Sequence, residues 1–174
     1  MNEQIEVMIS EQQVDERICE LANRISKDYE GKELHLIIIL KGSVFFACEL
    51  AKRITVPVTM DFMSVSSYGD GMVSAGHITV KKELDEDIEG KDVLIVEDIV
   101  DSGNTLFHLK NLLEGRSPAS LKIVTLLDKP DRRVKDVATD YCGFEIEDKF
   151  VVGYGLDYAQ KYRNLPYIRA NNTR

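Results

Sequence analysis

The sequence predicts an α/β protein with a mainly parallel central sheet flanked by helices. Three short apolar runs, at residues 34–40, 93–96 and 121–127, are typical of strands that are buried on both faces. Between them lie stretches whose apolar residues recur at helical spacing. Because strands that alternate with helices form βαβ units, most of these strands should run parallel to one another.

Each predicted element has a local signal. The first helix opens with the capping-box pair Ser10 and Gln13 and stops at Gly31. Residues 66–76 are small, polar and rich in glycine, which predicts a mobile loop. The last helix has leucines on one face and stops at Gly115. Strands are expected at residues 34–40, 56–65, 77–82, 92–97, 121–127 and 150–154, and helices at residues 14–25, 44–54 and 106–113.

Residues 1–174 are expected to form a single domain. A chain of 174 residues is long enough for one hydrophobic core, and no linker, repeat or low-complexity segment divides it. An acidic turn at residues 84–90 separates two of the strands. The tail after Pro166 is polar and is expected to fray.

Composition and charge exclude several classes of function. The net charge of −8 and the pI of 5.0 argue against nucleic acid as the main partner, since nucleic acid requires a basic surface. The first ten residues contain no basic residue, which predicts no signal peptide, and the longest apolar run is too short to span a membrane. The three cysteines have neither a disulfide nor a zinc spacing, so a cytoplasmic location is expected.

The stretch 93–106, VLIVEDIVDSGNTL, has the clearest chemical meaning in the chain. Two acids, Glu97 and Asp98, end an apolar strand, and Asp101 follows them. The small polar turn at the start of the next helix consists of Ser102, Gly103, Asn104 and Thr105. Unpaired N–H groups at such a turn suit a phosphate, whereas the carboxylates suit sugar hydroxyls or a metal ion. The stretch therefore predicts a site for a ribose 5-phosphate; the alternative is an ordinary turn in which Asp101 or Ser102 caps the helix.

This stretch resembles the phosphoribosyl diphosphate (PRPP) binding motif of the type I phosphoribosyltransferases, and the chain is most similar to the hypoxanthine-guanine members. Four more segments in the family's order carry the resemblance: LKGS at 40–43, SY at 67–68, DKP at 128–130 and DKFVVGYGLDY at 148–158. The resemblance implies the type I phosphoribosyltransferase fold, with a mobile active-site loop and a small hood region formed by the N- and C-terminal segments.

The resemblance also implies a role for each site residue. Asp101 would act as the general base for the purine N7 proton, and the peptide bond that enters Lys41 is often cis in the family. The other roles fall into four sets: PRPP phosphate and ribose at Glu97, Asp98, Ser102, Gly103, Asn104 and Thr105; pyrophosphate at Lys41, Gly42, Ser67, Tyr68 and Arg163; purine at Lys129, Phe150 and Val151; and Mg²⁺ at Asp157, Glu97 and Asp98.

Simpler interpretations compete with several of these roles. Lys129 could be a solvated lysine in a surface turn, and Phe150 could be a core aromatic in a late strand. Asp157 and Arg163 could form an exposed ion pair.

The implied activity is purine salvage, in which ribose 5-phosphate passes from PRPP to N9 of hypoxanthine or guanine. Small-molecule substrates would be the partners, with neither nucleic acid nor membrane, and the family usually forms dimers or tetramers. One alternative is a PRPP-sensing regulator without catalysis. Another is a phospho-acceptor receiver domain, but a receiver places its acid pair after the first strand. A P-loop hydrolase is excluded because the chain has no GxxxxGK[ST].

Overall fold

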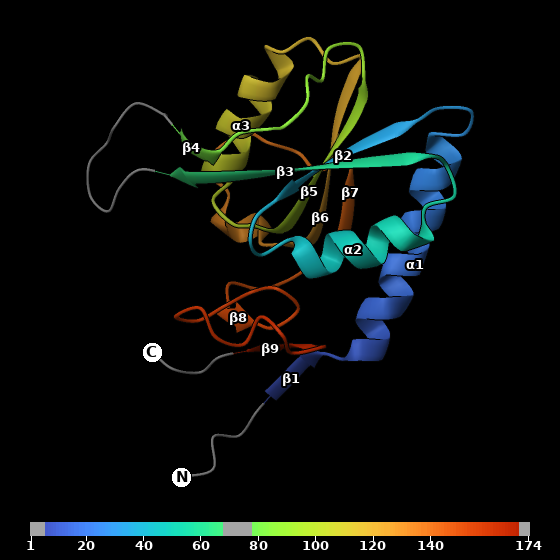
Figure 1. The fold of residues 1–174 in the computed structure, drawn as a ribbon. Coiled ribbons are helices and arrows are strands. Elements are labelled where there is room, and N and C mark those ends of the chain that lie inside the picture. The colour runs from blue at the N-terminus through green and yellow to red at the C-terminus, as the bar shows by residue number, and fades with distance from the viewer. Residues whose placement is uncertain (1–5, 68–77, 171–174) are drawn as a thin grey trace.

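A six-stranded sheet forms the centre of the computed structural model, which describes residues 6–67 and 78–170 (Figure 1). The strand order is β4-β3-β2-β5-β6-β7, and all neighbours are parallel except the antiparallel pair β3 and β4. The strands are β2 (Leu34–Ile39), β3 (Val58–Ser67), β4 (Ile78–Lys82), β5 (Asp92–Val100), β6 (Ser120–Asp128) and β7 (Tyr141–Glu145). The predicted α/β fold with a mainly parallel sheet is confirmed.

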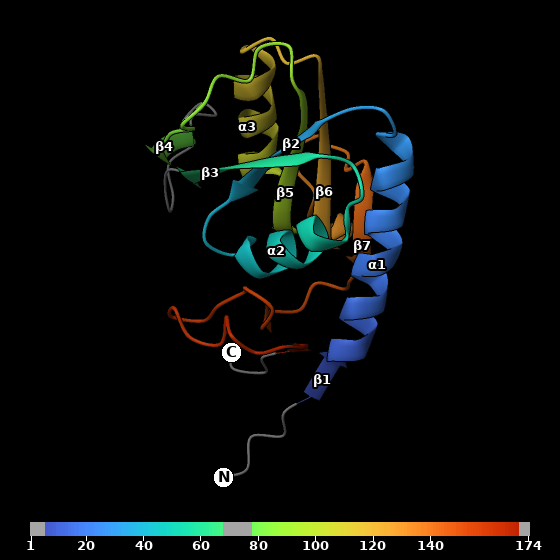
Figure 2. The ribbon, with the colours of Figure 1, turned by 45° about the vertical axis from the view of Figure 1, so that its right-hand side comes forward.

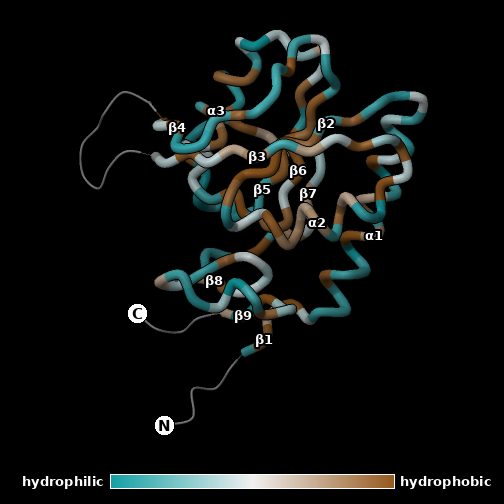
Figure 3. Tube along the Cα trace, viewed as in Figure 1, coloured by the Kyte–Doolittle hydropathy of each residue, from teal (hydrophilic) through white to brown (hydrophobic). Residues whose placement is uncertain are grey.

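Helices cover both faces of this sheet (Figures 1 and 2). They are α1 (Glu11–Asp28), α2 (Val44–Arg53) and α3 (Asn104–Glu114), and a short 3₁₀ helix, η1 (Pro130–Arg132), follows β6. In β2, Leu36 and Ile38 pack with the apolar residues of α1 and α2, whereas Ile37 and Ile39 pack with those of α3. The hydrophobic residues accordingly concentrate in the strands (Figure 3). This two-sided burial explains why the central strands are continuous apolar runs rather than alternating ones.

A second, three-stranded sheet joins the two ends of the described chain below the main sheet in Figure 1. It consists of β1 (Glu6–Ile9), β9 (Ile168–Ala170) and β8 (Val151–Val152), with β9 in the middle and antiparallel to both neighbours. The expectation that the tail after Pro166 frays is wrong for residues 168–170. Backbone pairing with β1, from the other end of the chain, holds β9 in place, and the fully buried Ile168 packs in the main hydrophobic core.

The predicted helices agree with the observed ones, whereas the predicted ends of some strands do not. The capping box of Ser10 and Gln13 is present with both reciprocal hydrogen bonds. The strand predicted at 92–97 extends to Val100, so the two acids lie within β5 rather than after it. The strands β1, β7 and β9 were not predicted. The predicted loop at 66–76 lies outside the described residues from Tyr68 onward.

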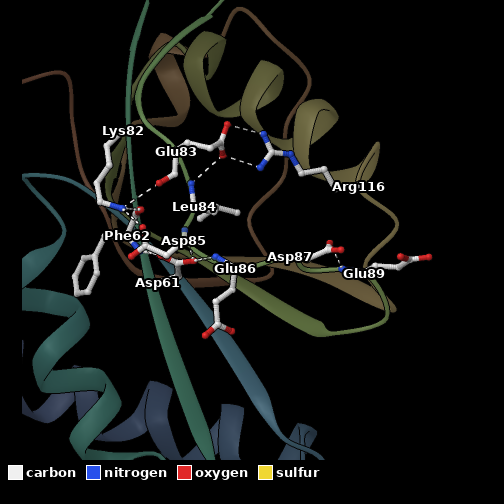
Figure 4. Close-up of polar contacts among 10 residues, drawn as sticks. All are labelled: Asp61, Phe62, Lys82, Glu83, Leu84, Asp85, Glu86, Asp87, Glu89 and Arg116. Carbon is white, nitrogen blue, oxygen red and sulfur yellow. Dashed lines mark hydrogen bonds and ion pairs between the residues drawn. The ribbon is translucent and has the colours of Figure 1, made fainter.

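The acidic turn after β4 is anchored by a buried carboxylate (Figure 4). Asp61 on β3 accepts hydrogen bonds from the backbone N–H groups of Asp85 and Glu86 at 2.9 and 3.0 Å. Arg116, just after α3, donates to both oxygens of Glu83 at 2.7 and 2.9 Å. These contacts attach the turn to β3 and to the end of α3, away from the site described below. No helix in the described ranges is long and apolar enough to cross a membrane.

Candidate active site

A cavity of about 240 Å³ lies at the carboxyl ends of β2 and β5. The cavity is lined by Gly42, by the two acids of β5 and by the turn that leads into α3. The lining includes Gly42, Glu97, Asp98, Asp101, Ser102, Gly103, Asn104 and Thr105, all of them predicted site residues. The carboxyl edge of a parallel sheet is where ligands bind in open α/β folds, so this cavity is the candidate active site.

Glu97 and Asp98 place two adjacent carboxyl groups in this cavity, and desolvation there disfavours their charged forms. Burial raises the pKa of Glu97 well above its usual range, and the neighbouring Asp98 raises it further. Burial also raises the pKa of Asp98, against the hydrogen bond from the Ile99 N–H at 2.8 Å and the charge of Arg163, which lower it. Two buried carboxylates with so little compensation suit hydrogen-bond donors or a cation from a ligand.

The turn before α3 is shaped to receive an anion. The N-cap residue of α3 is Gly103, in a left-handed conformation with φ of 78°, and no side chain caps the helix there. The simpler interpretation that Asp101 or Ser102 is the N-cap is therefore wrong, although Ser102 Oγ accepts the Asn104 N–H at 3.2 Å. The first turn of this eleven-residue helix lines the cavity, so the positive end of the helix dipole lies at the site.

Gly42 allows the loop after β2 to lie directly against the β5 acids. A Cβ at this position would stand 1.8 Å from Asp98 Oδ2, so no larger residue fits without a shift. The peptide bond between Leu40 and Lys41 is cis, as the resemblance implied. Lys41 Nζ lies 3.3 Å from Gln160 Oε1, which connects this loop to the late segment of the chain.

In that late segment, Arg163, predicted to bind pyrophosphate, and Asp157, predicted to bind Mg²⁺, belong to one hydrogen-bonded cluster. Arg163 lies 3.2 Å from Asp157 Oδ1 and donates to Gln160 Oε1 at 3.3 Å. The two members of the ion pair are 22% and 30% exposed, so the pair is partly buried rather than exposed. Gln160 accepts from both Lys41 and Arg163, and sequence reasoning missed it. Its place between Asp157 and Arg163 in the sequence was the only available signal.

The purine-side residues differ from their simpler interpretations. Lys129 is only 6% exposed, so it is not a solvated surface lysine, and its Nζ lies 3.9 Å from Asp148 Oδ1. Phe150 is 48% exposed, so it is not a core aromatic, and its ring packs edge-to-face with Tyr158 at 5.9 Å. Val151 is buried in β8. The side chain of Phe150 is therefore available to a flat ligand.

Asp101 lies on the cavity wall and forms an ion pair with Arg132. Arg132 Nε donates to Asp101 Oδ1 at 3.1 Å, and the Asp101 side chain is 46% exposed. Of the remaining predicted residues, Ser67 ends β3 and Tyr68 lies outside the described residues.

Metal binding by protein groups alone has little support in this site. In the described ranges, no three or more His, Cys, Asp or Glu residues are grouped as metal ligands. The carboxylates of Glu97 and Asp98 both line the cavity, and carboxylate oxygens are the ligands that a hard cation prefers when it takes its other oxygens from a bound substrate.

Comparison with known proteins identifies the family. Residues 9–159 match the phosphoribosyl transferase domain. The chain belongs to the phosphoribosyltransferase family.

Similar phosphoribosyltransferases cover nearly the whole chain. The hypoxanthine phosphoribosyltransferase of Salmonella typhimurium is 52% identical over 170 residues, 97% of this chain and 96% of that protein. The hypoxanthine-guanine phosphoribosyltransferase of Streptococcus thermophilus is 46% identical over 93% of this chain and 90% of that protein. A crystal structure of a hypoxanthine-guanine phosphoribosyltransferase from Bacillus anthracis superposes with a TM-score of 0.92 at 48% identity, covering 95% of this chain and 98% of that one. The fold is that of the type I phosphoribosyltransferases.

Proposed function

We propose that this phosphoribosyltransferase transfers the ribose 5-phosphate of PRPP to N9 of hypoxanthine or guanine. The products are IMP or GMP and pyrophosphate, and the role is purine salvage. The observation that carries the proposal is the pair formed by the buried Glu97 and the partly buried Asp98, which line one cavity with the N-terminus of α3. That arrangement suits a phosphate and the hydroxyls of its sugar on one ligand.

In this proposal, Glu97 and Asp98 accept hydrogen bonds from the ribose hydroxyls, and the turn Ser102–Thr105 binds the 5-phosphate. The bond between C1 and the pyrophosphate oxygen breaks as purine N9 bonds to C1, and Asp101 takes the N7 proton. The carboxylates also stabilise the positive charge that develops on the ribose. Catalysis thus depends on positioning and charge stabilisation, without a covalent enzyme intermediate.

Two clusters would receive the rest of the substrates. Lys41, Gly42 and Arg163, with Ser67 and Tyr68, would bind the pyrophosphate. Mg²⁺, which reactions of PRPP typically use, would be held by Asp157, Glu97 and Asp98 with substrate oxygens, and when bound it neutralises negative charge on the pyrophosphate.

On the purine side, Lys129 would donate to O6 and Phe150 would stack on the base, while the Val151 backbone meets its far edge. Adenine carries an amino donor at position 6 and would oppose the donor Lys129. The exposure of Phe150 and the burial of Lys129 support these roles.

Several features of organisation belong to the same proposal. The chain is one domain, in which the sheet of β1, β9 and β8 serves as the hood over the purine. The protein forms a homodimer or homotetramer and works in the cytoplasm, and it has no nucleic-acid partner.

An absorbance assay tests the function directly. The protein is mixed with PRPP and Mg²⁺, and hypoxanthine, guanine, xanthine and adenine are offered in turn. Turnover of a 6-oxopurine but not of adenine is expected. Turnover of adenine alone contradicts the role of Lys129. If no base reacts but PRPP raises the melting temperature, the protein senses PRPP without catalysis and the proposed function is wrong.

A further inference from the structure

Four alternating charges connect the proposed general base to the proposed purine-binding lysine. Arg132 Nε lies 3.1 Å from Asp101 Oδ1, and Arg132 Nη1 lies 3.4 Å from Asp148 Oδ2. The other oxygen of Asp148, Oδ1, lies 3.9 Å from Lys129 Nζ. Asp101 and Lys129 are therefore joined through Arg132 and Asp148, neither of which the sequence had marked for its side chain.

This network joins three separate parts of the chain. Asp101 directly follows β5. Lys129 directly precedes η1, the short helix after β6, and Arg132 is its last residue. Asp148 precedes β8. Arg132 uses two different nitrogens and Asp148 two different oxygens, so each residue bridges two partners at once. A guanidinium is suited to this because its donors are fixed in one plane.

Stability alone does not account for the network. The side chains of Asp101, Arg132 and Asp148 are 46%, 51% and 50% exposed, and ion pairs in such positions contribute little to folding. Lys129, by contrast, is buried, and its Nζ has Asp148 as its ion-pair partner among the described residues. The network thus lies at the surface of the site and ends on a buried cation.

The chemistry of a 6-oxopurine matches the two ends of the network. O6 is an acceptor and N7–H is a donor, and the two are neighbours on one edge of the base. Lys129 is a donor, and Asp101 is an acceptor whose Oδ1 already accepts from Arg132. Both groups must be held at a spacing that fits this edge, and a lysine on a flexible stem needs a fixed partner for that.

We infer that Arg132 and Asp148 are positioning residues that hold Asp101 and Lys129 at the spacing required by the O6 and N7 edge of a 6-oxopurine. This inference rests on the proposed function. Arg132 fixes the Asp101 carboxylate through Oδ1 and leaves Oδ2 to the substrate, and Asp148 fixes the Lys129 ammonium. The pair therefore helps select a base with an acceptor beside a donor.

Steady-state kinetics of Arg132→Gln, Asp148→Asn and the double variant test the inference. The KM for hypoxanthine and guanine should rise about fivefold in each single variant, the upper end of what a half-exposed ion pair is worth. The KM for PRPP should stay within about twofold, because the network does not reach the ribose or pyrophosphate groups. The double variant should be no worse than the poorer single variant, since both changes break one chain of contacts.

Two further variants separate positioning from a general effect of charge or stability. Arg132→Lys keeps the charge but cannot bridge two carboxylates, so it should restore only part of the purine KM. Arg116→Gln breaks the comparable pair with Glu83, remote from the site, and should leave both KM values unchanged.

The result that overturns the inference is a purine KM within about twofold of wild type in Arg132→Gln, or an equal rise in both KM values. Independent, additive effects of the two single variants also overturn it. These outcomes require an active wild-type enzyme. A wild-type protein that turns over no 6-oxopurine instead refutes the proposed function itself, so the two failures are distinguishable.

Discussion

Replacement of Gly42 by alanine should disable the PRPP site while the rest of the fold persists. The alanine Cβ would lie 1.8 Å from Asp98 Oδ2 and 2.7 Å from Asp98 Cγ. Real Cβ atoms essentially never approach another atom within 3.0 Å, so the two groups must separate by about 1.2 Å. The Asp98 carboxylate is partly buried, and its Oδ1 accepts the Ile99 N–H at 2.8 Å, which limits how far it can turn.

The size of the effect follows from this displacement. A misplacement of about 1 Å in a catalytic site can cost about 100-fold in rate. We therefore expect kcat/KM for PRPP to fall about 100-fold, equivalent to about 2.7 kcal/mol of transition-state stabilisation. The loss arises because the displaced carboxylate no longer meets the ribose hydroxyls.

The assay is initial-rate kinetics at saturating hypoxanthine with varied PRPP. Gly115→Ala is a matched control, because Gly115 has ordinary helical φ and ψ of −64° and −13°, and it should change kcat/KM little. Asp98→Ala provides the sharper comparison: in that background the carboxylate is gone, so Gly42→Ala should cost little more. A PRPP kcat/KM within about threefold of wild type in Gly42→Ala would refute the steric reasoning.

Three further predictions concern charge and metal. Glu97→Gln should bind PRPP more weakly yet melt at a higher temperature than wild type at pH 8. Burial and Asp98 raise the pKa of Glu97, so its ionised form opposes folding, and the gain should vanish near pH 4; an unchanged melting temperature at pH 8 contradicts this. Glu83→Gln should lose less than about 1 kcal/mol in urea unfolding at pH 7, because Glu83 is half-exposed. Since Arg116 lowers the pKa of Glu83 to about 2, the loss should shrink as pH falls below about 4.3, and a pH-independent difference argues against the pair. Removal of Mg²⁺ with EDTA should abolish turnover without changing the circular dichroism spectrum, and added Mg²⁺ should restore it; turnover in EDTA excludes the metal.

Local patterns in the sequence predicted much of the main sheet and part of the site. Buried parallel strands need continuous apolar runs, and Leu34–Ile39 shows one directly. The capping box at Ser10 depends on residues three positions apart, so it is visible without a structure. The acids Glu97 and Asp98 and the turn after them are also contiguous in sequence, which is why their shared cavity was predictable.

The features that the sequence did not reveal all depend on residues far apart in the chain. The β9 strand has only three residues, too few to show a period, and its burial requires β1 from the opposite end. Gln160 belongs to the site because its side chain accepts a hydrogen bond from Lys41, which lies 119 positions away in the sequence. Arg132 gains its proposed role from its contacts with Asp101, which follows β5, and with Asp148, which precedes β8.

Local patterns were therefore enough to predict the class of fold, the position of the acidic turn and the kind of ligand that suits it. Helix caps, apolar periods and phosphate turns arise from forces between neighbours along the chain, so a single stretch of residues suffices to predict them. The tertiary structure alone decided that Lys129 is buried and Phe150 exposed. It also decided which charges meet around the purine side of the site. Burial and ion pairing depend on what the rest of the chain places beside a residue, and no local pattern encodes that.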